Sequence, residues 1–68
     1  MNLITRFKIV ALLVVQMDLP EVYQRKVDVV AQMIDKNSEY KLNGLMLLEA
    51  MVLDYVEKME LIEDINLN

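Results

Sequence analysis

The sequence contains no cysteine, no histidine, and only one glycine and one proline. Without cysteine, no disulfide can stabilise the chain, and without cysteine and histidine the usual ligands of a structural zinc ion are missing. The same absences remove the thiol nucleophile and the one side chain that ordinarily titrates near neutral pH. A single glycine also excludes a glycine-rich phosphate-binding loop. We therefore expect no enzymatic activity, no metal and no cofactor.

One acidic pattern deserves a chemical interpretation. Glu57, Glu60 and Glu63 follow one another at intervals of three. Glutamates on helices bind metals in di-iron bundles, but those sites also require a Glu-x-x-His motif, which a chain without histidine cannot supply. We interpret the three glutamates as surface charge.

The size and the apolar content of the chain point to self-association. Its 68 residues make one small domain, and 56% of them are hydrophobic, against about 45–50% in ordinary domains. A chain of this length buries only about 60% of the surface of its unfolded state. Small domains compensate with disulfides, metals or oligomerisation, and only the last remains here. We expect a homo-oligomer, with a two-fold dimer favoured because it is the commonest closed assembly.

The scarcity of glycine and proline predicts helices, and the apolar periodicity places three of them, at about residues 2–17, 19–36 and 43–65. In the first, Leu3, Phe7 and Val10 begin a heptad stripe, while Ile9, Leu12 and Leu13 fall on the opposite side. A helix that is apolar all round is buried all round. We expect another copy of the chain to cover part of the run from Ile9 to Val15.

Two other interpretations of this run are weaker. A β-strand would suit its β-branched residues, but the sequence offers no hairpin turn and no second strand. A signal peptide would explain Arg6 and Lys8 ahead of the run, but no small-residue cleavage site follows. The run is also far shorter than the ~20 residues of a membrane-spanning helix.

The second predicted helix has clear signals at both ends. We expect Asp18 to cap its start, with Pro20 in the first turn and Glu21 completing a capping box. Glu21 and Arg25 stand at the spacing of a favourable ion pair. Lys36, Asn37 and Ser38 supply a cation and a C-cap candidate at the other end.

The third predicted helix, expected to start at Asn43-Gly44, has the clearest heptad signal, with an apolar stripe from Leu45 to Ile62. Its end is acidic. Residues 45–68 carry six acidic side chains and one lysine, and carboxylates near a helix C-terminus are unfavourable. Either the end is solvated, or positive charge meets it from Arg6 and Lys8 or from a partner protein.

These observations predict an all-α, three-helix chain that forms an oligomeric, most simply dimeric, helical bundle. The first and third helices should form the core between subunits, and the second should pack across them with its charged face outward. The residues assigned to self-association are Leu3, Phe7, Ile9, Val10, Leu12, Leu13, Leu45, Met46, Leu48, Met51, Val52, Tyr55, Met59 and Ile62.

For function we expect a cytoplasmic protein that acts by contact, as an inhibitor, adaptor or antitoxin-like regulator of a larger protein. The surface assigned to that partner comprises Leu47, Asp54, Glu57, Leu61 and Asp64, with Arg25 and Lys26 as a second choice. A purely structural assembly module and a small protein anchored to a membrane surface by its first helix are the alternatives. With a net charge of −4 and seven scattered basic residues, direct binding of nucleic acid is not expected, although an acidic face could mimic it.

Overall fold

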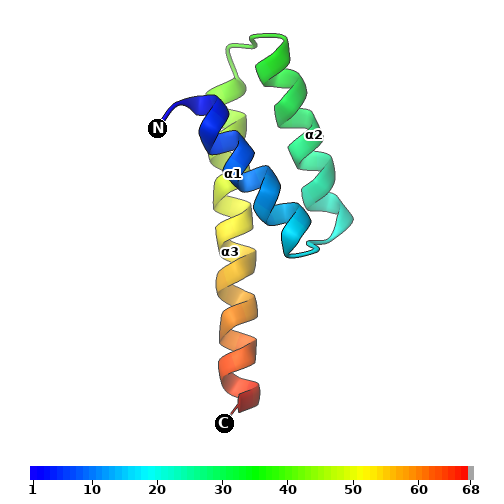
Figure 1. Ribbon diagram of the computed structural model, residues 1–68, viewed down its shortest axis with the longest axis vertical. Helices are drawn as coiled ribbons and strands as arrows, with labels where there is room; N and C mark the ends of the chain where they lie inside the picture. Colours follow the sequence, from blue (N-terminus) through cyan, green and yellow to red (C-terminus); the bar gives the residue numbers. More distant parts are fainter. Residues whose placement is uncertain (68) are drawn as a thin grey trace.

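The structure is a computed structural model that describes the backbone of residues 1–67 and the side chains of residues 1–63. It consists of α1 (Leu3–Gln16), α2 (Glu21–Asp35) and α3 (Lys41–Leu67), with no strand in the described part of the chain. Figure 1 shows α1 crossing α3 and α2 running back alongside α3. The prediction of an all-α chain with three helices is confirmed, and the strand alternative for the apolar run is wrong.

The first helix is capped at its start by Asn2. The side-chain Oδ1 of Asn2 accepts a hydrogen bond from the backbone N–H of Thr5, at 2.8 Å. This bond satisfies one of the four N–H groups that a helix leaves without a partner at its first turn.

Asp18 ends α1 instead of capping α2. Its φ of 50° is left-handed, a conformation that aspartate tolerates better than most residues. Its N–H donates to the carbonyl of Val15, and the N–H of Leu19 donates to the carbonyl of Val14, which together form a Schellman motif. The predicted capping box is therefore wrong: Pro20 precedes α2, and no side chain caps that helix.

The turn after α2 uses the same motif. Asn37 is left-handed with a φ of 53°, and the N–H of Ser38 donates to the carbonyl of Met33 at 2.8 Å, so the C-cap prediction is confirmed. The next helix begins at Lys41, ahead of the predicted Asn43-Gly44. Gly44 lies inside α3, where a Cβ atom would come within 2.7 Å of the sulfur of Met33. Its lack of a side chain leaves room for the Met33 side chain of α2.

Seven apolar side chains form the core between the three helices: Val10, Val14, Leu19, Val30, Leu45, Leu48 and Val52. Tyr23 and Tyr55 extend this core, with their rings edge to face and 5.1 Å between the centroids. No polar or charged side chain of the described residues is buried. The polar face of α2 is exposed as predicted, and the predicted pair between Glu21 and Arg25 forms at 3.0 Å.

The length of α3 leaves part of it uncovered. At 1.5 Å per residue, its 27 residues span about 40 Å, whereas the 14 and 15 residues of α1 and α2 span only about 21 and 23 Å. In Figure 1 the C-terminal part of α3 extends well beyond both. We call residues 57–67 the projecting segment of α3. The stripe that is buried at Leu45 and Leu48 reaches this segment at Met59 and Ile62, which are 39% and 52% exposed.

Candidate protein-binding surfaces

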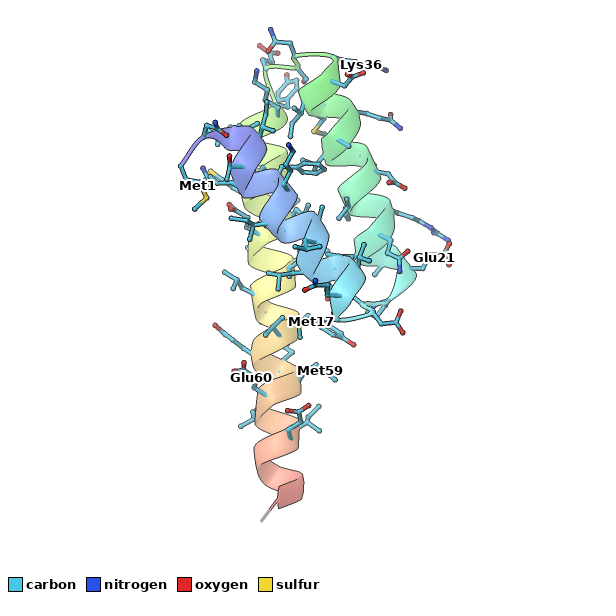
Figure 2. The ribbon with its side chains drawn as sticks, in the orientation of Figure 1. Met1, Met17, Glu21, Lys36, Met59 and Glu60 are labelled. Carbon is cyan, nitrogen blue, oxygen red and sulfur yellow. The ribbon has the colours of Figure 1, made fainter. Side chains whose placement is uncertain are left out.

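The projecting segment carries one candidate surface. Met59 and Ile62 continue the core-facing stripe of α3 and are 39% and 52% exposed, and Figure 2 shows Met59 beyond Met17 at the end of α1. Glu63 and Glu60 lie along one edge of the stripe, Glu57 lies farther around the helix, and all three are exposed. An uncovered apolar stripe with an acidic edge fits an apolar groove that has basic residues along one side of its rim.

The lysine of this region is already engaged. The ammonium of Lys58 lies 2.9 Å from a carboxylate oxygen of Asp54, one helical turn earlier. The hydrogen bond and the charge of Asp54 raise the pKa of Lys58. The pair is exposed, so it contributes little to stability. Its consequence is electrostatic: with Lys58 paired to Asp54, the glutamates dominate the charge of the projecting segment.

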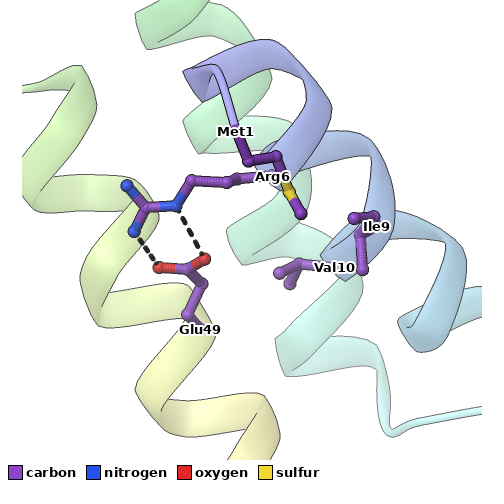
Figure 3. Close-up of a pocket in the computed structure, with 5 residues that line it drawn as sticks. All are labelled: Met1, Arg6, Ile9, Val10 and Glu49. Atoms are coloured by element: carbon purple, nitrogen blue, oxygen red, sulfur yellow. Dashed lines mark hydrogen bonds and ion pairs between the residues drawn. The ribbon is translucent and has the colours of Figure 1, made fainter.

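A groove between α1 and α3 forms the second candidate surface, and an ion pair closes one end of it. In Figure 3 the guanidinium of Arg6 reaches from α1 to Glu49 on α3, through two hydrogen bonds of 2.6 and 3.2 Å. The hydrogen bond and charge of Glu49 raise the pKa of Arg6. Beside this pair, Met1, Ile9 and Val10 line a space of about 410 Å³. The groove continues toward the C-terminal ends of α1 and α3 as a space of about 330 Å³ beside Leu13, Val52 and Leu53.

The residues assigned to self-association are divided by the fold into three groups. Those in the core of the single chain are Val10, Leu45, Leu48 and Val52. Those of intermediate burial are Leu3, Phe7, Leu13, Met51 and Tyr55. Those exposed are Ile9, Leu12, Met46, Met59 and Ile62. Only the exposed group offers substantial surface to a second molecule in this conformation.

Leu13 corrects one detail of the helix prediction. It was assigned to the side of the first helix away from the core, together with Ile9 and Leu12. Ile9 and Leu12 are indeed 45% and 56% exposed, but Leu13 packs against the core. At 100° per residue, the side chain of Leu13 points only about 60° around the helix from that of Val10. Both side chains can therefore pack against the core.

The residues assigned to a larger partner lie on two helices. Leu47, Asp54 and Leu61 are exposed and recur every seven residues, so they share one face of α3, with Glu57 at its edge. Arg25 and Lys26 are exposed on α2, where Arg25 already pairs with Glu21. Asp64 lies outside the residues whose side chains are described.

Glu49, Ala50 and Leu53 belong to the groove side of α3, and sequence reasoning did not assign them to a site. Arg6 was expected to be one source of charge for the acidic end of the third helix; the structure pairs it instead with Glu49. The sequence signal that could have identified Leu53 is its position beside the heptad stripe of the third helix. No local pattern could have identified an ion pair between residues 43 positions apart.

The described residues provide no group of three or more His, Cys, Asp or Glu side chains placed to hold a metal ion. Within the same residues, no helix has the length and apolar character needed to cross a bilayer. No protein-family model, curated protein or solved structure matches this chain.

Proposed function

We propose that this chain is a non-catalytic helical protein that self-associates and acts in the cytoplasm by binding a larger protein, as an inhibitor, adaptor or antitoxin-like regulator. The observation that supports it is the course of α3, which carries the stripe of the core past the end of the two helices that cover it. Met59 and Ile62 thereby lie on the part of α3 that extends beyond α1 and α2, and they are 39% and 52% exposed.

The chemistry of the partner follows from the edges of the stripe. Residues 54–63 contain four acidic side chains and one lysine, so they carry a net charge of −3. A complementary partner presents an apolar groove, into which a helix inserts side chains at i, i+3 and i+7, with Lys or Arg along the rim. A helix with few tertiary contacts is marginally stable in water, so docking would also stabilise the projecting segment itself.

The proposal is tested by capture from host lysate on immobilised chain. Wild type should retain one protein at a stoichiometric ratio, and Ile62→Glu should lose it, because a charge then enters the apolar groove of the partner. Val15→Glu is the matched control: Val15 is an apolar residue of α1 that is 72% exposed and lies beside Gln24 and Val27 of α2, not on α3. Circular dichroism should show that both variants remain helical.

Retention of the same protein by Ile62→Glu at the wild-type level would refute the role of the projecting segment. Failure of the wild type to retain any protein, together with a large homomer in light scattering, would favour the purely structural assembly module instead. The apolar groove between α1 and α3 supports that second candidate, because a self-assembling protein needs a surface of this kind.

A further inference from the structure

Two exposed apolar patches lie on the side of the molecule that carries the groove between α1 and α3, at the same level along the two helices. On α1, Ile9 and Leu12 are 45% and 56% exposed; on α3, Met46 and Leu53 are 52% and 59% exposed. Ile9 and Leu53 line the same continuous groove, so the patches adjoin. We call this surface, with Ala50 between Met46 and Leu53, the α1/α3 face.

Each helix of the α1/α3 face has a pattern that is nearly symmetric about its centre. On α1 the face reads Thr5, Ile9, Leu12 and Gln16, with polar residues at the ends and apolar ones in the middle. On α3 it reads Leu42, Met46, Ala50, Leu53 and Glu57, with its centre at Ala50. Since Ile9 lies beside Glu49 and Leu53, the two centres are at the same level of the bundle.

We infer that a second copy of the chain covers the α1/α3 face, in an antiparallel two-fold dimer centred on Ala50. This inference deepens the proposed self-association and rests on it. A two-fold axis in the plane of the face and perpendicular to the helices places each helix on its own counterpart. Ile9 then faces Leu12 of the second copy, Met46 faces Leu53, and Ala50 faces Ala50. The small side chain on the axis permits close approach of the two α3 helices.

Charge selects the antiparallel orientation. In a parallel dimer the two projecting segments would lie together, and Glu57 and Glu60 of both copies would repel one another. In the antiparallel dimer each projecting segment runs beside the N-terminal ends of α1 and α3 of the other copy, where the helix dipoles favour carboxylates. Residues 1–16 add Lys8 and contain no acidic side chain, whereas Arg6 is already paired with Glu49.

The size of the face predicts a dimer of moderate affinity. Two helices per copy that meet over about three to four turns bury on the order of 500 Å² per copy, below the ~800 Å² of a standard stable interface. We therefore expect dissociation at micromolar concentrations, where a dilution series can follow it.

The α1/α3 face is tested by sedimentation equilibrium of the full chain across a dilution series. Leu53→Glu should weaken dimerisation at least 100-fold, because it buries a charge opposite Met46 of the second copy. Val22→Glu should leave the dissociation constant within about threefold: Val22 is 50% exposed, close to the 59% of Leu53, but lies on α2, outside the α1/α3 face. A dimer unaffected by Leu53→Glu would overturn this face and leave self-association intact. A folded wild type that is monomeric at 1 mM would overturn self-association as well.

The orientation is tested by disulfide formation, since the native chain has no cysteine. Ala50→Cys should form a dimeric disulfide under mild oxidation, because residues on the axis come within the distance that a disulfide spans. Leu42→Cys should not, because antiparallel pairing separates the two copies of residue 42 by roughly 24 Å along the helix axis. Rapid cross-linking of Leu42→Cys would show a parallel dimer and overturn the antiparallel arrangement.

Discussion

Leu48 and Leu53 offer a sharp test of the fold, because they are identical side chains on one helix in opposite surroundings. Leu48 is 1% exposed in the core, and Leu53 is 59% exposed on the α1/α3 face. Leu48→Ala removes buried methyl groups and leaves a cavity, which lowers the free energy of unfolding by about 2–5 kcal/mol. Leu53→Ala removes little buried surface from a single copy, so its expected effect on the monomer is about 0.5 kcal/mol or less.

These magnitudes are large relative to the stability of so small a chain. A domain of this size has a free energy of unfolding of roughly 3–10 kcal/mol. Leu48→Ala therefore removes about a fifth of it or more, and the variant should unfold at a much lower urea concentration. Urea titrations followed by far-UV circular dichroism measure both variants, with the slope compared to that of the wild type to confirm two-state behaviour.

A small effect of Leu48→Ala on the free energy of unfolding would contradict the core described above. If Leu48→Ala costs less than about 1 kcal/mol, or no more than Leu53→Ala in dilute solution, the core described above does not stabilise the chain. Repeating the titrations at high protein concentration adds a second test. The cost of Leu53→Ala should then increase, because only the wild type is further stabilised by the second copy.

Three other changes test local features of the fold. Asp18→Gly should raise the free energy of unfolding by about 0.5–1 kcal/mol, because glycine adopts a φ of 50° without strain. Asp18→Val should lower it by at least as much, and thermal melts of the two variants measure both changes. Asn2→Ala should cost about 1 kcal/mol in a urea titration, whereas Asn2→Asp should keep the cap. Arg6→Met and Glu49→Gln should each lower the melting temperature by a few degrees, and their combination should add little, because they break the same ion pair. An additive double variant would show that the two side chains act independently.

The helices and most of the core could be predicted from the sequence because the signals are local. The heptad stripes through Val10, Val14, Leu48 and Val52 identify the sides that are buried, since periodicity depends only on neighbours along the chain. The same stripes explain why β-branched residues in the first helix do not form a strand: the one-sided burial of a helix outweighs their intrinsic preference.

The turns and the contacts between helices could be predicted less well. Asp18 is a good N-cap residue and also tolerates the left-handed conformation, so its type does not decide which helix it terminates. The choice accompanies the burial of Leu19, which follows Asp18 in the Schellman motif and is 2% exposed. The pair between Arg6 and Glu49 depends on how α1 crosses α3, which no pattern along one helix specifies.

The sequence predicted that apolar side chains would be exposed, but it did not predict which surfaces they form. The apolar surplus predicted uncovered side chains, and the exposure of Ile9, Leu12 and Met46 agrees with it. The prediction that helices 1 and 3 meet mainly between subunits did not anticipate that Leu45 and Leu48 would be covered within one chain. The apolar stripes of three short helices can cover one another. Because α3 is longer than α1 and α2, its C-terminal part is left without cover.

The two proposed surfaces lie on different sides of α3, and this determines how they combine. Leu53, on the α1/α3 face, is about 120° around the helix from Met59 and about 180° from Ile62. A partner that covers Met59 and Ile62 therefore need not displace the second copy, and the antiparallel arrangement places the two projecting segments at opposite ends of the dimer. The complex should contain two chains and two partner molecules, and mass measurement in solution should find this ratio. A complex of one chain with one partner, formed from dimeric protein, would show that both ligands compete for the same surface.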